Sequence, residues 1–213
     1  MPSAFRGVVL VVVLCVGLLV ACTFPPGPPA PTPDQVALRQ SDVPGGWARC
    51  SWSGGIDAYL GALRQRDPAS AQQVQQTWDA LKGRGAESAQ VTGFSQGGQH
   101  CDPVPGGGSG PSATSWVAGY RDTDAARAGY RQGVLGFPTP TEEREQPGLQ
   151  VGVATGLSAD AWTLNQTQPP PPIYLAWWRE GSLTSFLLTV GYDAGASRAI
   201  AMKMDGRMGQ QPD

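Results

Sequence analysis

Two apolar runs joined by a single glycine leave this chain few choices of fold: residues 173 to 180, IYLAWWRE, and residues 182 to 190, SLTSFLLTV. In the second run Phe186, Leu188 and Val190 stand at every second position, which is the side-chain period of a β-strand. The glycine between the runs supplies a tight turn, so the pair predicts a β-hairpin. We therefore expect the sheet of this protein to be antiparallel.

The strongest helical pattern begins at the dipeptide Asp67-Pro68, a capping side chain followed by a proline at the first helical position. Val74, Trp78 and Leu81 then recur at helical spacing, which predicts an amphipathic helix. Weaker patterns predict a helix at about 57 to 63, strands at 88 to 95 and 113 to 120, a helix after Asp122 that ends at Gly136, and a last helix at about 195 to 208.

The order of these elements repeats. Gly119-Tyr120 lies before the third predicted helix and Gly191-Tyr192 before the last one, at a shift of about 71 residues. This favours an internal duplication of about 85 to 136 and 156 to 208, although chance recurrence of common residues is the alternative. Strands followed by a helix, twice, predict an α+β domain in which an antiparallel sheet carries helices packed on one face, with two pseudo-repeated halves.

The amino terminus is typical of an exported protein. Residues 8 to 21 contain no charged or polar side chain, but they are too few to span a bilayer, which takes about 20. The sequence therefore predicts a signal peptide over 1 to 21. Leu19-Val20-Ala21-Cys22 resembles the lipobox of bacterial lipoproteins, which implies that Cys22 is lipidated. An ordinary secretory signal that happens to contain a cysteine is the alternative.

Residues 23 to 34, TFPPGPPAPTPD, are half proline, so they favour extended polyproline II and cannot build a core. We expect the lipidated cysteine and this tether, 22 to 34, to hold a single α+β domain, 35 to 213, at the outer face of the cell membrane. Acyl chains on Cys22 would make the cytoplasmic membrane its first partner.

Four cysteines are present, of which Cys15 lies in the signal peptide and Cys22 is the lipid acceptor. The remaining two, Cys50 and Cys101, predict one disulfide in an exported chain. Two free thiols or a metal pair are the alternatives. His100 is the one histidine of the chain, which is too few ligands for a structural zinc site, so no metal and no cofactor is expected.

The charge and the aromatic content of the chain limit the classes of partner that it is expected to bind. Without Arg6 the chain carries 14 basic and 17 acidic residues, so nothing points to nucleic acid. Seven tryptophans are available to fill a core or to line a binding surface. Trp177 and Trp178 are neighbours on one predicted strand and point to opposite faces, so one of them is a candidate for ligand contact. The alternative is that helices cover one and a loop covers the other.

The stretch VTGFSQGG, residues 91 to 98, resembles the nucleophile turn of α/β-hydrolases, with Ser95 as the nucleophile. Such a turn is followed by a helix, whereas this serine is followed by the glycine- and proline-rich QGGQHCDPVPGGG. A hydrolase of this order also takes its base from a later histidine, but His100 lies only five residues on. Ser95 is therefore predicted to end a strand near a disulfide, and the two glycines after it to let the chain turn toward Cys101.

The start DVPGGW, residues 42 to 47, and the later WWREG, residues 177 to 181, resemble motifs of poorly characterised cell-envelope lipoproteins from actinobacteria and related bacteria. The resemblance implies a lipid-anchored, extracytoplasmic α+β module of a class that binds ligands or partners. Because the sequence offers no complete catalytic set, we expect a non-catalytic binding or accessory module. The other hypotheses are a secreted serine hydrolase that uses Ser95 and a structural or assembly protein of the envelope.

Overall fold

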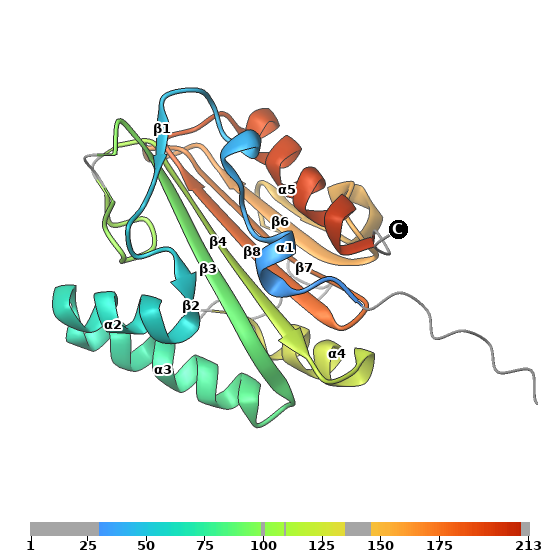
Figure 1. Ribbon diagram of the computed structural model, residues 1–213. Helices are drawn as coiled ribbons and strands as arrows, with labels where there is room; N and C mark the ends of the chain where they lie inside the picture. Colours follow the sequence, from blue (N-terminus) through green and yellow to red (C-terminus); the bar gives the residue numbers. More distant parts are fainter. Residues whose placement is uncertain (1–29, 99–100, 109, 135–145, 210–213) are drawn as a thin grey trace, which may run out of the picture.

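The described part of the computed structural model, residues 30–98, 101–108, 110–134 and 146–209, is built on one eight-stranded antiparallel sheet (Figure 1). The strands follow one another across the sheet in the order β1-β3-β4-β8-β7-β6-β5, and β2 pairs with β3 beside β1. Their bounds are β1 Trp47–Arg49, β2 Gly54–Gly55, β3 Ala86–Gln96, β4 Ser112–Tyr120, β5 Leu149–Val151, β6 Asp160–Gln166, β7 Ile173–Glu180 and β8 Leu183–Val190. The antiparallel α+β class predicted from the sequence is confirmed.

Five α-helices and two short 3-10 helices accompany the sheet in the described residues. They are α1 Pro33–Val36, α2 Ile56–Arg66, α3 Pro68–Lys82, α4 Thr123–Gln132 and α5 Ala194–Gly209, with η1 Gln40–Asp42 and η2 Gly152–Thr155. The α4 helix ends four residues before the predicted stop at Gly136, because Gly133 takes a positive φ of 81° at its end. None of the helices in the described ranges has both the length and the apolar character needed to cross a bilayer.

The predicted hairpin is present as β7 and β8, and it contributes to a row of aromatic rings across the sheet. Trp116 of β4 stands opposite Phe186 of β8, Phe186 opposite Trp177 of β7, and Trp177 opposite Trp162 of β6. All four side chains are buried. We call the surface that they line the aromatic face of the sheet.

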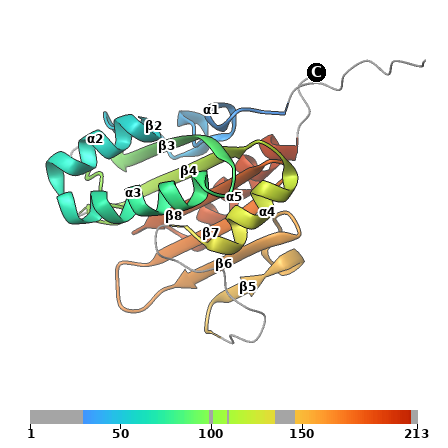
Figure 2. The ribbon, with the colours of Figure 1, turned by 90° about the horizontal axis from the view of Figure 1, so that it is seen from below.

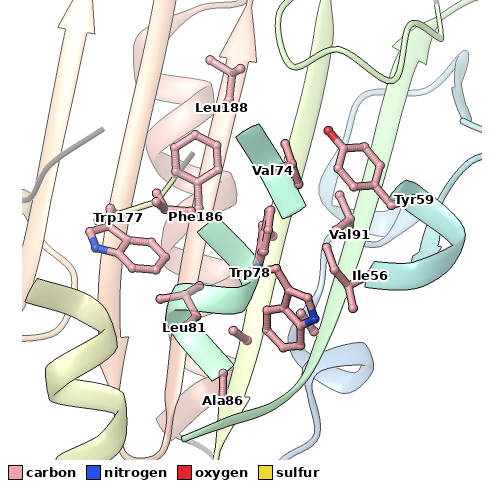
Figure 3. Packing of buried hydrophobic residues seen from close by; sticks show 14 of the residues in the cluster. Ile56, Tyr59, Val74, Trp78, Leu81, Ala86, Val91, Trp177, Phe186 and Leu188 are labelled. Carbon is pink, nitrogen blue, oxygen red and sulfur yellow. The ribbon is translucent and has the colours of Figure 1, made fainter. Parts of the chain in front are cut away.

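Helices α2, α3 and α4 cover the aromatic face (Figures 2 and 3). The ring of Trp78 in α3 lies 6.5 Å from that of Trp116, and the ring of Tyr130 in α4 stacks on Trp177 at 5.9 Å. The indole Nε1 of Trp177 also donates a hydrogen bond of 3.0 Å to the Tyr130 carbonyl. Burial of large rings against amphipathic helices is thus the main stabilising contribution on this side.

The opposite surface of the sheet, which we call the hydroxyl face, combines buried serines and threonines with a second apolar cluster, which includes Phe94, Tyr174 and Trp178. Its buried polar members are Thr92, Ser115, Thr163, Ser185 and Thr189. Helix α5 packs here through Ile200, Ala201, Met204 and Met208, and Ser197 Oγ lies 2.7 Å from Thr189 Oγ1. The short side chains let α5 and α1 lie close to the strands.

Helices therefore lie on both faces of the sheet, whereas the sequence predicted them on one (Figure 1). The reason is that central strands are apolar on both sides: every residue of β8 is buried. Trp177 and Trp178 do point to opposite faces, as predicted, but both are completely buried. Neither indole forms an exposed contact surface.

The two proposed repeats share an order of elements but not an arrangement. A shift of 71 residues matches β3, β4 and α4 with β6, β8 and α5. However, β3 pairs directly with β4, whereas β7 separates β6 from β8. The helices α4 and α5 also lie on opposite faces. The internal duplication therefore stays a prediction from the sequence.

The folded part begins slightly earlier than predicted. Pro33 and Asp34, assigned to the tether, form the first turn of α1, because Pro33 occupies the first helical position and the Gln35 side chain accepts a hydrogen bond from the Thr32 N–H. The predicted lipidation residue Cys22, the predicted signal peptide and most of the predicted tether lie outside the described residues.

Candidate functional site

A groove of about 470 Å³ lies on the hydroxyl face between the N-terminal segment and the β1–β3 edge of the sheet. One wall comes from α1 and the residues that follow it, and the other from β1 and β3. We call it the β3 groove; its lining residues are Asp34, Ala37, Leu38, Arg39, Gln40, Arg49, Gln90, Thr92 and Phe94. Its volume is in the range of small-molecule sites.

The strand register places the β-wall of this groove. Gln90, Thr92 and Phe94 alternate along β3, so they share one face, and Arg49 of β1 stands directly opposite Phe94. Thr92 and Phe94 are buried at the floor, while the Arg49 side chain is exposed at the rim. Helix α1 lies beside both β3 and β4. Just after it, the Leu38 N–H donates to Ser115 Oγ of β4 at 3.2 Å, which places this segment along the groove.

A buried arginine from the far end of the chain holds the other wall. The guanidinium of Arg207 in α5 donates to the carbonyls of Val36 at 3.0 Å and Ala37 at 3.2 Å, and to both carboxylate oxygens of Asp42 at 3.0 and 2.8 Å. Asp42 in turn accepts a 2.9 Å hydrogen bond from the backbone N–H of Arg39. Because the side chain of Asp42 is only 3% exposed, this bidentate pair is protected from water and firmly fixes the wall.

The groove carries two cations that no carboxylate neutralises. Neither Arg39 nor Arg49 forms an ion pair with any residue in the described ranges. Arg39 donates to the Gln35 carbonyl, and Arg49 has no side-chain hydrogen bond within the described chain. The acid in the lining, Asp34, accepts a 2.6 Å hydrogen bond from Thr32 Oγ1. The net charge of the lining is positive, so the groove can attract an anion.

Ser95 lies on the other side of β3, away from this groove. Its side chain is completely buried, and its Oγ is 3.3 Å from Cys101 Sγ. Gly97 and Gly98 follow with φ of 69° and 70°, so the chain turns toward the disulfide as predicted. A substrate cannot reach this hydroxyl. His100 lies outside the described residues.

The glycine of the same motif also serves packing. A Cβ at Gly93 would lie 2.1 Å from the Trp52 ring, so only glycine lets the indole cross the strand at this point. Trp52 Nε1 donates to the Cys101 carbonyl at 3.1 Å. The residues GFSQGG, 93 to 98, therefore have structural roles. Gly93 makes room for the Trp52 ring, Ser95 packs against the disulfide, and Gly97 and Gly98 form a turn.

The predicted disulfide between Cys50 and Cys101 is present. Beside it a shallow hollow of about 460 Å³ is lined mainly by Trp52, Pro103 and α2 residues. The Tyr59 hydroxyl donates to the Pro103 carbonyl at 2.8 Å, and burial, with a smaller contribution from nearby Asp102, raises the Tyr59 pKa above its usual range. Arg66 closes the rim through an ion pair with Asp102 at 3.1 Å. With its cation paired, this hollow offers less to a charged ligand than the β3 groove.

Both motifs behind the lipoprotein resemblance have structural roles. In DVPGGW, Asp42 binds Arg207, and the ring of Trp47 packs edge-on against Tyr192 at 5.2 Å. In WWREG, Arg179 donates to the Gly181 carbonyl at 3.2 Å and pairs with Asp160 across the sheet. These residues hold the N-terminal segment and the hairpin.

Sequence reasoning missed Arg39 and Arg49 as candidates. They are ten residues apart in a segment without periodicity, and only the pairing of β1 with β3 and the Arg207 contacts bring them to one groove. Within the described ranges, no group of three or more histidine, cysteine, aspartate or glutamate side chains is placed to hold a metal ion.

Comparisons with known proteins give one structural similarity. No family model matches the sequence, and no curated protein matches it. The chain is similar to the crystal structure of the extracellular domain of PknH from Mycobacterium tuberculosis, with a TM-score of 0.44 and 12% sequence identity over 85% of this chain and 98% of that one.

Proposed function

We propose that this protein is a non-catalytic binding module, tethered by lipid to the outer face of the cell membrane, that holds an anionic ligand in the β3 groove. The observation that carries the proposal is the presence of Arg39 and Arg49 in one groove without a partner carboxylate. Guanidinium groups bind carboxylates and phosphates through paired, charge-assisted hydrogen bonds.

The tether and compartment rest on the amino terminus and the cysteines. A fourteen-residue apolar run, the lipobox with Cys22 and a proline-rich spacer are the parts of a lipid-anchored export signal. The Cys50–Cys101 disulfide supports the same location, because structural disulfides persist outside the reducing cytoplasm.

Binding rather than hydrolysis is favoured by how the polar groups are used. Ser95, the candidate nucleophile, is enclosed against the disulfide. The groove itself presents guanidinium and amide groups together with the Thr92 hydroxyl, which suit recognition through hydrogen bonds.

The groove is tested with an anion and a neutral analogue of the same shape. Titrating hexanoate into ¹⁵N-labelled protein should shift the Nε–Hε signals of Arg39 and Arg49, while hexanol should not. Because each charge-assisted bond contributes about 1.5–3 kcal/mol, Arg39→Ala or Arg49→Ala should each weaken binding about tenfold or more. Arg64→Ala is the matched control, since Arg64 is exposed and bonds Gln75 on the other side of the molecule. Equal effects of all three variants would contradict the proposal.

The anchor is tested separately. Cys22→Ser should move the protein from the membrane fraction to the culture supernatant or soluble fraction, and mass spectrometry of the wild-type amino-terminal peptide should show acyl chains. A Cys22→Ser protein that stays membrane-bound would rule out this anchor without affecting the groove.

A further inference from the structure

The proposed anion site leaves open which chemical class the ligand belongs to, and the remaining lining residues address that question. Its apolar members are almost completely covered: Ala37, Leu38 and Phe94 are 3%, 4% and 2% exposed. A long acyl chain would find little apolar surface to bury here. Recognition must come from the polar atoms of the groove.

Those polar atoms fall into two groups. Arg39 and Arg49 stand on opposite walls and offer two guanidinium groups, which match the charge of a phosphate dianion. The second group is neutral or acidic. The Gln90 side chain has no hydrogen-bond partner in the described chain. Gln40 Nε2 donates a hydrogen bond to the Trp47 carbonyl at 2.9 Å, which leaves Gln40 Oε1 as an acceptor.

Asp34 narrows the chemical class of ligand that the groove would bind. A carboxylate in the lining repels a bare anion, but it accepts hydrogen bonds from hydroxyl groups. A ligand that carries its charge at one end and hydroxyls at the other would satisfy both groups of side chains. This argument rests on the proposed anion-binding function.

We infer that the ligand of the β3 groove is a phosphorylated polyol. Its phosphate binds between Arg39 and Arg49, and its hydroxyls bond Gln90 and Asp34. The same chemistry is found in a free sugar or glycerol phosphate and in the glycerophosphate headgroup of an anionic lipid. The lipid source is within reach, because only eleven residues separate the lipid-acceptor Cys22 from Asp34.

The closing experiment is isothermal titration of protein lacking residues 1 to 22, since every described element begins at or after Pro33. Glycerol 3-phosphate, inorganic phosphate, glycerol and hexanoate are compared. Glycerol 3-phosphate should bind about tenfold more tightly than inorganic phosphate, and glycerol should not bind. Arg39→Ala and Arg49→Ala should weaken both phosphates about tenfold or more, with Arg64→Ala unchanged.

Two further variants isolate the hydroxyl contacts. Gln90→Ala should weaken glycerol 3-phosphate severalfold and leave inorganic phosphate unchanged. Asp34→Asn should tighten inorganic phosphate and so reduce the preference for the polyol. If Gln90→Ala weakens both phosphates equally, or if the two phosphates bind alike, the inference is overturned. Hexanoate binding without glycerol 3-phosphate binding overturns the inference but leaves the anion site standing, whereas no binding of any anion overturns both.

The source is resolved by sedimentation with vesicles. Binding to phosphatidylglycerol vesicles but not to phosphatidylcholine vesicles, competed by free glycerol 3-phosphate and lost in Arg49→Ala, identifies the lipid headgroup as the source. Binding of glycerol 3-phosphate in solution without binding to either vesicle identifies a soluble phosphate instead.

Discussion

The two faces of the sheet are covered by helices in different ways. On the aromatic face, the row of Trp116, Phe186, Trp177 and Trp162 packs under α2, α3 and α4. Figure 3 labels Phe186 and Trp177 beside Trp78 of α3. On the hydroxyl face, α1 and α5 pack on a second apolar cluster that includes Tyr174 and Trp178. Hydrogen bonds from Leu38, Ser197 and Arg207 also connect these helices to the rest of the fold. The first arrangement depends mainly on buried apolar area, and the second adds several directional contacts to it.

This difference explains where the candidate site lies. On the aromatic face, large rings fill the space between helix and strand, whereas on the hydroxyl face a groove remains between the N-terminal segment and strands β1 and β3. A wall that an ion pair holds in place needs no large apolar core beneath it. The β3 groove therefore lies on the hydroxyl face, beside the wall that Arg207 holds.

The largest effect is expected from removing a central ring. Trp177→Ala deletes a fully buried indole and its hydrogen bond to the Tyr130 carbonyl, and should lower the free energy of unfolding by about 3–5 kcal/mol. Urea unfolding measures the loss. Trp178 is equally buried on the other face, but its Nε1 has no hydrogen-bond partner among the residues that the structure describes. Trp178→Phe should therefore cost less than Trp177→Phe, and the reverse order would contradict the role given to the Tyr130 contact.

Breaking the ion pair should come next. Arg207→Ala leaves the buried Asp42 carboxylate without its cation and should cost about 3 kcal/mol, with loss of anion binding in the β3 groove. Arg179→Ala is the matched control. The Arg179 side chain is 13% exposed, much like the 14% of Arg207, but its partner Asp160 is 39% exposed and the pair lies on the other face of the sheet. It should cost about 1 kcal/mol and leave binding intact. Loss of binding in both variants would mean that the effect is general instability.

A smaller effect is expected where the chain crosses Trp52. Gly93→Ala places a methyl group against the indole and should destabilise the protein by about 1–3 kcal/mol in thermal or urea unfolding. Gly61→Ala in α2 is the opposite case, since a Cβ there meets nothing within 4 Å. It should stabilise the helix by about 0.5–1 kcal/mol. A neutral Gly93→Ala would show that Trp52 is free to move.

The smallest effect is expected at alkaline pH, where one buried tyrosine on each face of the sheet loses its proton. Burial raises the pKa of Tyr120, on the aromatic face, to about 12, and it does the same for Tyr174 on the hydroxyl face. Since the folded pKa exceeds the unfolded value of 10.0, each hydroxyl contributes stability that is complete below pH 10 and is lost as pH rises toward 12. Denaturation between pH 8 and 12 should show this decline, and Tyr120→Phe or Tyr174→Phe should each reduce its slope. An unchanged slope would contradict the burial of that phenol.

Much of the fold could be predicted because its signals are local. The hairpin of β7 and β8, the α3 helix with its Asp67 cap and the α5 helix follow from residue spacing within one segment. The short strands β1 and β5 could not be predicted, since three residues carry no period and depend on a partner strand. The sequence also did not predict helices on both faces of the sheet. The residues of β8 are equally consistent with a single buried face, on which large apolar side chains alternate with smaller residues that point away from it.

Local chemistry by itself determined the antiparallel hairpin, the helix caps and the pairing of Cys50 with Cys101, since each depends on residues close in sequence or on their number. The same local chemistry predicts the export signal. Only the tertiary structure decided that Ser95 is enclosed by a disulfide, that Trp177 and Trp178 are both core, and that Arg39 and Arg49 share a groove. The physical reason is that these outcomes depend on which surfaces meet. Strand order placed β1 beside β3, and a single arginine near the carboxyl terminus brought the N-terminal segment against them.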